Sequence, residues 1–134
     1  MSIPPCSGII VIDLDKTILV STKNGNYSFP KGKKNKGETS LDTAWRELEE
    51  ETGLSKENVE IIDDYQIDEN SNKGNIAIRY YVGKLIKHPN KLTYDPDELQ
   101  NVEWIQIDKA YKIEKFKNRR KEILKQVYEK MLSL

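Results

Sequence analysis

The sequence lacks the features that mark secreted and membrane proteins. Cys6 is the only cysteine, so the chain cannot form an internal disulfide, which fits a reducing compartment. No apolar run approaches the roughly 18 residues of a membrane-spanning helix, and no signal peptide is visible at the N-terminus. We therefore expect a cytoplasmic protein that does not enter a membrane.

The chain also lacks a net charge, because 22 Lys and Arg residues balance 22 Asp and Glu residues. No overall electrostatic field would therefore draw the protein to DNA or to a membrane surface. Internal repeats, low-complexity tracts and long linkers are absent, and 134 residues are enough to bury one core. We expect one domain over residues 1–134. The single histidine, His88, precedes a proline and is expected to be exposed rather than catalytic.

An acidic helix is predicted over residues 40–52. Thr39 suits the N-cap, Asp42 follows three residues later as in a capping box, and Gly53 suits the left-handed residue that ends a helix. The residues expected to face the core recur at helical spacing: Leu41, Ala44, Trp45, Leu48 and Thr52.

Three glutamates, Glu47, Glu50 and Glu51, lie at positions i, i+3 and i+4 and so share another face of this helix. At an effective dielectric constant near 20, two carboxylates about 4 Å apart repel by roughly 4 kcal/mol. A hard divalent cation such as magnesium would offset that repulsion with oxygen ligands. The alternative is a solvated acidic face paired with nearby lysines.

The spacing around the helix resembles a known motif. Gly32, five residues, Glu38, seven residues and then the run from Arg46 to Leu54 resemble the Nudix box in every defined position. The resemblance implies an α/β/α sandwich around a mixed sheet, with the catalytic helix in the box and a second helix at the C-terminus. It also implies an enzyme that uses magnesium or manganese to cleave a nucleoside diphosphate linked to another moiety.

The resemblance also implies roles for the residues of the box. Glu50 and Glu51 would be the principal metal ligands, and Glu47 would be a ligand or the general base. Arg46 would pair with acids and orient the helix, and Glu38 would support the metal site.

The approach to the box, Phe-Pro-Lys-Gly over residues 29–32, resembles the entry to Nudix boxes. In that family the backbone carbonyl before the first glycine is a metal ligand, which places that role on Lys31. Gly32 would let the backbone come close at this point. Lys31 and Lys33 could also hold a polyphosphate as point charges, and the alternative is a solvated lysine-rich loop.

A further acid is expected from a late loop. In several relatives it lies six residues before a tryptophan, and Glu98 stands in that relation to Trp104. Asp97 is the alternative, and either could be a plain loop acid. A metal site gains from an oxygen ligand opposite the helix, so we favour Glu98.

The distal half of the chain is similar to diadenosine tetraphosphate hydrolases around Tyr80, the segment 98–104 and Phe116. The resemblance implies that Tyr80 and Phe116 stack on adenine, and core packing is the alternative for both. Dinucleoside polyphosphates are therefore the first expectation for the substrate, a small-molecule nucleotide or other polyphosphate.

Other substrates and a binding role stay open. The lysine-rich entry to the box resembles mRNA-decapping enzymes and suits diphosphoinositol polyphosphates, so capped RNA is a second possible partner. A catalytically silent Nudix module that binds a nucleotide is a further alternative, although all the acids of the box are present. The sequence does not predict the oligomeric state.

A rival motif lies near the N-terminus. Residues 9–17 resemble the first motif of haloacid dehalogenase-like phosphatases, with Asp13 as nucleophile and Asp15 as acid/base, and residues 61–64 mimic its late acidic pair. Only about 50 residues separate the two, too few for the doubly wound sheet that the family needs. Asp13 and Asp15 are better explained as residues of a hairpin turn.

Elsewhere the pattern predicts strands and one more long helix. Strands are expected at residues 7–12, 17–20, 27–29, 59–67, 76–86 and 102–107. A short helical turn over 109–111 would be capped by Asp108. The apolar stripe of the C-terminal helix is marked by Phe116, Ile123, Leu124, Val127, Met131 and Leu132.

Overall fold

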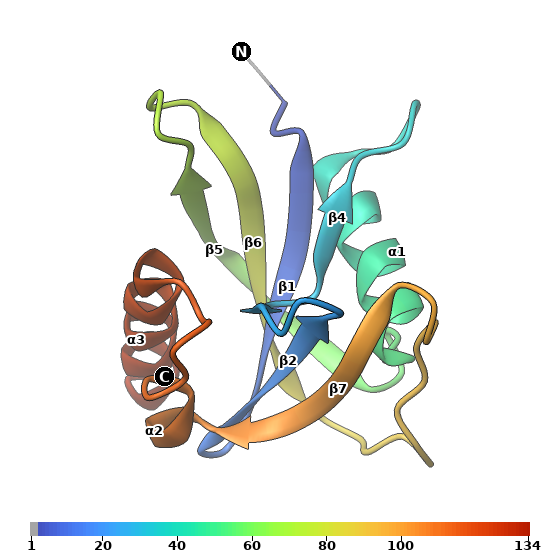
Figure 1. The fold of residues 1–134 in the computed structure, drawn as a ribbon, viewed down its shortest axis with the longest axis vertical. Coiled ribbons are helices and arrows are strands. Elements are labelled where there is room, and N and C mark those ends of the chain that lie inside the picture. Colours follow the sequence, from blue (N-terminus) through green and yellow to red (C-terminus); the bar gives the residue numbers. More distant parts are fainter. Residues whose placement is uncertain (1–2) are drawn as a thin grey trace.

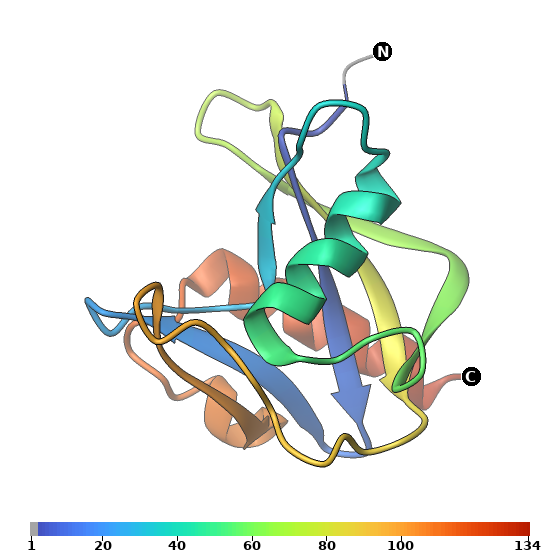
Figure 2. The ribbon, with the colours of Figure 1, turned by 90° about the vertical axis from the view of Figure 1, so that its right-hand side faces the viewer.

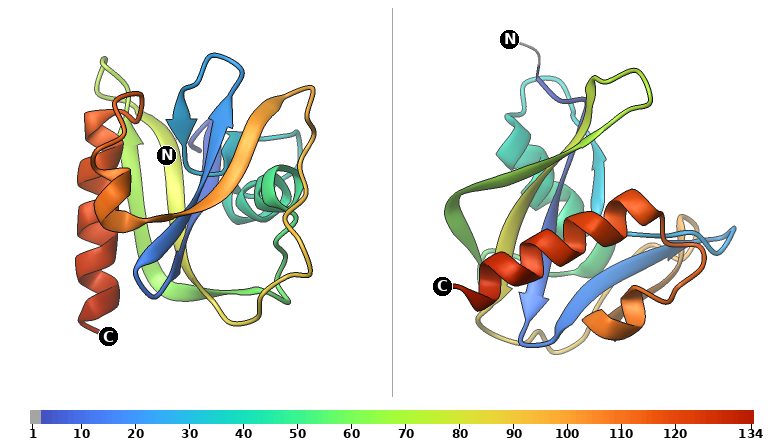
Figure 3. Two further views of the ribbon diagram at one scale, coloured as in Figure 1. Left: turned by 60° about the horizontal axis from the view of Figure 1, so that its bottom comes forward. Right: turned by 90° about the vertical axis from the view of Figure 1, so that its left-hand side faces the viewer.

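This computed structural model describes residues 3–134 of the chain. They form a central sheet with a long helix on each side (Figure 1). Helix α1 (Ser40–Thr52) crosses one side of the sheet and helix α3 (Asn118–Leu132) crosses the other (Figures 2 and 3). The short helix α2 (Ile107–Ala110) packs into the same core as α3. The expected α/β/α sandwich is confirmed. Within residues 3–134 no helix combines the length and the apolar character needed to cross a membrane.

The sheet is mixed, as expected. Its strands are β1 (Cys6–Asp13), β2 (Lys16–Thr22), β3 (Tyr27–Ser28), β4 (Lys31–Lys33), β5 (Val59–Asn70), β6 (Ile76–Leu85) and β7 (Leu99–Gln106). Strand β1 pairs parallel with β6 and antiparallel with β2 and β4. Strand β5 pairs with the far edge of β6, and both β3 and β7 pair with β2.

Strand β1 is apolar throughout because both of its faces are covered. Ile10 and Ile12 belong to the core beneath α3, whereas Ile9 and Val11 belong to the core beneath α1. Successive side chains of a strand point to opposite faces, so an unbroken apolar run supplies both cores. The strand expected at residues 7–12 therefore lies between the two helices.

Two strands share one edge of β1. Strand β4 pairs with the first residues, from Cys6 to Gly8, and β2 pairs with the last two, Ile12 and Asp13. Residues 31–33 were expected in a loop, and that expectation is wrong because their backbone completes this edge. As a result, the approach to α1 is held against β1.

Several smaller expectations are also corrected. Leu41 is 39% exposed and Leu132 is 68% exposed, so neither belongs to the core-facing stripe of its helix. Phe116 is buried but precedes α3. Helix α2 follows an N-cap at Gln106, which leaves Asp108 in the first turn rather than at the cap.

The phosphatase alternative is wrong. Strand β1 ends at Asp13 and leads through a tight turn into the antiparallel strand β2, with Asp13 paired to Lys16. That motif needs a doubly wound parallel sheet, which this mixed sheet is not. Asp13 and Asp15 are hairpin residues, and the exposed His88 lies 3.5 Å from the Asp13 carboxylate.

Candidate active site

Helix α1 begins and ends where the sequence predicts. The Asp42 backbone N–H donates to Thr39 Oγ1 over 3.0 Å, and the Thr39 N–H donates to Asp42 Oδ2 over 3.1 Å, which completes a capping box. Gly53 ends the helix at φ 81°, and its N–H donates to the Glu49 carbonyl. These caps fix which side chains face the sheet.

The acidic face of α1 lies against strand β4. The backbone N–H of Lys31 donates to Glu51 Oε1 over 3.1 Å. A Cβ atom at position 32 would overlap the carboxylate of Glu47, so only glycine allows this approach. Strand β4 therefore partly buries two of the three glutamates.

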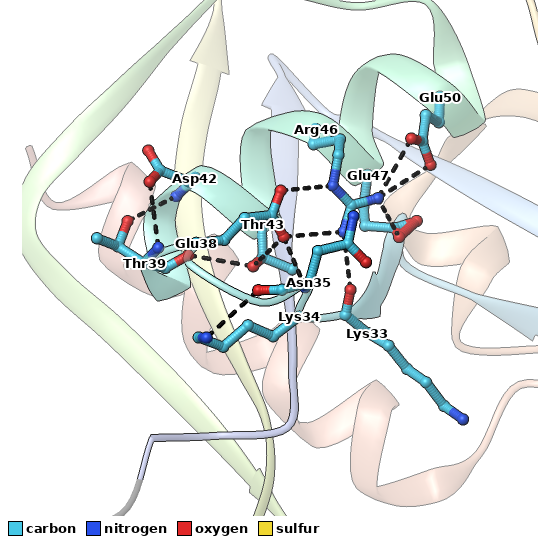
Figure 4. Close-up of polar contacts among 10 residues, drawn as sticks. All are labelled: Lys33, Lys34, Asn35, Glu38, Thr39, Asp42, Thr43, Arg46, Glu47 and Glu50. Carbon is cyan, nitrogen blue, oxygen red and sulfur yellow. Dashed lines mark hydrogen bonds and ion pairs between the residues drawn. The ribbon is translucent and has the colours of Figure 1, made fainter.

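Arg46 connects the loop between β4 and α1 with the acidic face of α1 (Figure 4). Its guanidinium donates to Glu38 at 2.6 and 3.1 Å and to the Lys33 carbonyl at 2.8 Å. Its Nη1 atom lies 3.2 Å from carboxylate oxygens of both Glu47 and Glu50. The hydrogen bond from Arg46 lowers the pKa of Glu38 to about 2, with help from the Asn35 N–H. Arg46 thus holds the loop and the helix together, and Glu38 accepts two of its hydrogen bonds.

Burial makes negative charge on two of the carboxyl groups costly. It raises the pKa of Glu51 to about 7; the Lys31 N–H opposes that shift, and the charges of Glu47 and Glu98 add to it. Burial also raises the pKa of Glu47, against the effect of Arg46. Both groups therefore favour a bound proton or a bound cation.

Glu98 lies in the loop before β7. Its charge acts on both Glu47 and Glu51, which places it near the acidic face. Asp97 instead closes a turn, its N–H donating to Asp95 Oδ1 over 2.9 Å. Of the two acids that the sequence offers, Glu98 is the one whose charge acts on Glu47 and Glu51.

The loop that carries Glu98 is attached to the end of α1. The backbone N–H of Thr93 donates to the Thr52 carbonyl over 3.0 Å. A Cβ atom at Gly53 would overlap Thr93 Oγ1. The glycine that ends the helix therefore also makes room for this loop.

The donor set fits a hard divalent cation. The carboxylates of Glu47, Glu50, Glu51 and Glu98 offer oxygen ligands, as magnesium and manganese prefer. Within residues 3–134 no three acidic, His or Cys side chains are already grouped as ligands of one ion. Arg46 occupies the space beside Glu47 and Glu50 instead, so a cation would draw these carboxylates away from the guanidinium.

The structure does not bring Tyr80 and Phe116 to the site as adenine-binding groups. Tyr80 is fully buried and Phe116 is 1% exposed. Phe29 lies between them, with ring centroids 5.2 Å from Tyr80 and 5.5 Å from Phe116, edge to face in both pairs. Neither ring presents a face to a base, so the expected stacking is corrected to core packing.

Sequence reasoning missed a buried ion pair beside these rings. Arg120 Nε lies 2.9 Å from Glu69 Oε1, and the Tyr80 hydroxyl donates to the same oxygen over 3.1 Å. Glu69 and Arg120 are 4% and 8% exposed. Because 51 residues separate them, no local pattern signals the pair.

Sequence reasoning also missed a pocket of about 250 Å³ next to β4. Its lining combines small polar, tyrosine and basic residues: Thr22, Asn26, Tyr27, Ser28, Lys31, Lys115, Lys117 and Arg120. Lys33 is exposed and is not part of this lining. The signal that could have found the pocket is the pair of lysines flanking Phe116.

Comparison with known proteins identifies the family. The model of the NUDIX domain matches residues 3–127, and the chain therefore belongs to the Nudix family. The resemblance that the box predicts is confirmed.

Two curated relatives act on RNA, according to their names. An RNA pyrophosphohydrolase of Sodalis glossinidius (strain morsitans) is 42% identical over 60 residues, which cover 43% of this chain and 34% of that protein. The m7GpppN-mRNA hydrolase dcap-2 of Caenorhabditis elegans is 32% identical over 118 residues, which cover 78% of this chain and 14% of that protein. The chain thus spans about a third or less of these relatives' length.

Solved structures share the fold. A binary complex of the C. elegans Ap4A hydrolase aligns over 96% of this chain and 99% of that chain, with a TM-score of 0.84 and 21% identity. The NUDIX domain of Shewanella oneidensis NrtR, crystallised with ADP ribose, aligns over 98% of this chain and 90% of that chain, with a TM-score of 0.72 and 14% identity.

Proposed function

We propose that this chain is a metal-dependent pyrophosphohydrolase that hydrolyses a phosphoric anhydride bond in a nucleoside diphosphate linked to another moiety, with dinucleoside polyphosphates as its substrates. The observation that carries the proposal is the partly buried carboxylate pair on α1, Glu47 and Glu51, whose pKa values are both raised. Such a pair is stabilised by a divalent cation, and a cation beside a diphosphate is what this reaction requires.

Each residue has a proposed part in holding the reacting groups. Glu50 and Glu51 hold the cation together with the Lys31 carbonyl, and Glu98 approaches from the loop opposite the helix. The bound cation would neutralise phosphate oxygens and lower the pKa of a bound water. Glu47 acts as a ligand or takes the proton from the attacking water.

Arg46 has a positioning role and takes no part in the reaction itself. Its contacts with Glu38 and the Lys33 carbonyl would keep the loop in place if Glu47 and Glu50 turned from the guanidinium to a bound cation. Its planar group can make several hydrogen bonds at once, which a lysine cannot reproduce.

The test is hydrolysis of a substrate panel with magnesium or manganese: diadenosine polyphosphates, capped RNA, ADP-ribose and inositol pyrophosphates. We expect turnover of diadenosine polyphosphates, and at least a hundredfold lower kcat for Glu51→Gln with an unchanged circular dichroism spectrum. Near-native turnover by Glu51→Gln would contradict the ligand assignment. Absence of turnover of every substrate by the unmodified protein would favour a nucleotide-binding module.

Capped RNA is the second candidate substrate. It is favoured by the similarity to dcap-2, which extends over 78% of this chain. Faster hydrolysis of capped RNA than of diadenosine tetraphosphate would place this substrate first.

A further inference from the structure

Exposed apolar residues gather at one end of the molecule, where the β1–β2 turn meets the end of β6 and the last turn of α3 (Figure 3). A hollow of about 390 Å³ lies there. Its apolar lining, which we call the hairpin patch, consists of Ile12, Leu14, Leu85, Met131 and Leu132. Leu14 is 87% exposed and Leu132 is 68% exposed, so large apolar side chains from two different elements face solvent beside the hollow.

Leu14 occupies an unusual position for a leucine. It is the first of the two residues that join β1 to β2, because Asp13 pairs with Lys16. Its φ is 55°, a left-handed conformation that glycine or asparagine usually supplies in such turns. A leucine here strains the backbone and also leaves its side chain in water. Neither effect stabilises a single copy of the chain, so a contact with another molecule explains the residue better.

The hairpin patch is complementary in shape to a copy of itself. A twofold axis brings the same surface of two subunits together, so each surface must offer both a protrusion and a hollow. Leu14 protrudes at the rim of the hollow that it lines. Two copies related by such an axis can therefore each place Leu14 in the hollow of the other, which removes apolar surface from water.

The charges around the hollow are complementary in the same way. Asp15 follows Leu14 in the turn, and Lys84 lines the hollow. Both are exposed, and no ion pair among residues 3–134 involves either side chain. An Asp15 that accompanies Leu14 to the hollow of the other copy meets Lys84, and twofold symmetry forms this pair twice. Opposite charges at these positions favour a second copy as the occupant.

We propose that the hairpin patch joins two copies of this chain in a symmetric dimer, with Leu14 of each copy in the hollow of the other and Asp15 facing Lys84 across the interface. The interface lies away from the candidate active site. Strand β4, which contacts Glu51, pairs with residues 6–8 at the start of β1, whereas the turn follows the end of β1. The dimer therefore leaves the acidic face of α1 uncovered.

Sedimentation velocity of the whole chain tests the dimer. The unmodified protein should change from monomer to dimer between about 2 and 200 µM, as expected for a small interface. Leu14→Asn should weaken the association at least about tenfold, because it removes the central apolar contact. A monomer at every concentration would overturn the proposal.

The matched control is Ile3→Asn, since Ile3 is 63% exposed and lies outside the hairpin patch. This variant should associate as the unmodified protein does. Equal effects of Ile3→Asn and Leu14→Asn would overturn the role of the hairpin patch.

A stability measurement shows that Leu14→Asn still folds. Asparagine tolerates a positive φ better than leucine does, so this variant should have a higher urea midpoint than the unmodified protein when both are monomeric. A higher midpoint together with weaker association supports a leucine that is retained for a contact between copies.

A charge exchange tests the symmetry of the interface. Asp15→Lys and Lys84→Asp should each weaken self-association, because like charges then face each other. An equal mixture of the two variants should associate more tightly than either variant alone. In the mixed dimer the two introduced side chains meet, and Asp15 of one copy meets Lys84 of the other. No gain on mixing would overturn the proposed arrangement. These measurements follow association and not hydrolysis, so their outcome is independent of the proposed function.

Discussion

At the scale of single residues, Glu51 shows how burial prepares a carboxyl group for a cation. Strand β4 covers it, and the Lys31 N–H fixes one of its oxygens. Burial raises its pKa to about 7, so the side chain holds a proton in the metal-free protein under conditions where an exposed glutamate is ionised. A metal ion and a proton therefore compete for the same oxygen atoms.

This competition predicts the pH dependence of the metal-free protein. The folded state keeps the Glu51 proton between pH 4.5 and about 7 while the unfolded chain loses it, so the free energy of unfolding should fall as pH rises through that range. Urea denaturation in the presence of a chelator at pH 5, 6, 7 and 8 measures the slope. Glu51→Gln should flatten it.

Glu49→Gln is the matched control, since it removes an exposed carboxylate from the same helix. It should keep the slope of the unmodified protein. If Glu51→Gln also kept that slope, the buried position assigned to Glu51 would be wrong. Added magnesium should stabilise the unmodified protein more at pH 8 than at pH 6, because fewer protons compete with it there.

At the scale of elements, the junction between α1 and the loop before β7 fixes how the acids meet. Gly53 has a positive φ of 81° and also faces Thr93, whose backbone bonds to the last turn of the helix. The same loop carries Glu98. One glycine thus fixes both the end of the helix and the path of the opposing acid.

Alanine variants of two glycines with nearly the same backbone conformation distinguish the strain of a positive φ from the contact with Thr93. Gly53 has φ 81° and Gly74 has φ 84°, but a Cβ atom at Gly74 would meet nothing within 4 Å. Gly74→Ala should cost about 1–2 kcal/mol of unfolding free energy, the strain of a left-handed alanine. Gly53→Ala should cost more and also lower kcat, because Thr93 and the loop with Glu98 must move.

Urea denaturation and assays with diadenosine tetraphosphate measure these two quantities. Equal stability losses in both variants, with full activity in Gly53→Ala, would contradict the role of the Thr93 contact.

At the scale of the whole molecule, one buried ion pair ties α3 to the sheet. Arg120 of α3 and Glu69 of β5 pair in the core, with the Tyr80 hydroxyl as a third partner. Arg120→Leu leaves a buried carboxylate without its counter-charge and should cost about 3–5 kcal/mol of unfolding free energy. The double variant Glu69→Leu/Arg120→Leu should cost less, because no charge is left behind.

The half-exposed pair of Arg79 and Asp68 on neighbouring strands is the comparison. Arg79→Leu should cost at most about 1 kcal/mol in the same urea denaturation measurement. A loss from Arg120→Leu no greater than this would show that the buried pair does not hold α3 in place.

Local patterns in the sequence predict much of this molecule. The bounds of α1 follow from Thr39 and Gly53, and the shared face of the three glutamates follows from their spacing. The family follows from the spacing of the box. These features depend on residues close together in the chain, where helix geometry relates position to direction.

The rest depends on contacts between distant segments. Nothing near Tyr80 in the sequence shows that Phe29 covers its ring, and nothing near Lys115 shows that it meets Tyr27. Strand β4 was missed because Lys31 to Lys33 have the composition of a loop, and only pairing with β1 makes them a strand. Tertiary contacts of this kind override local propensity.

The parallel pairing of β1 with β6 has a consequence for the order of folding. Cys6 lies opposite Ile78, so the central strand pairs with a strand more than seventy positions later in the chain. Closing such a long loop slows folding, and the core beneath α1 includes residues of both strands. Because β4 and the sheet cover Glu51, the pKa of this side chain is raised only once the sheet around it has formed.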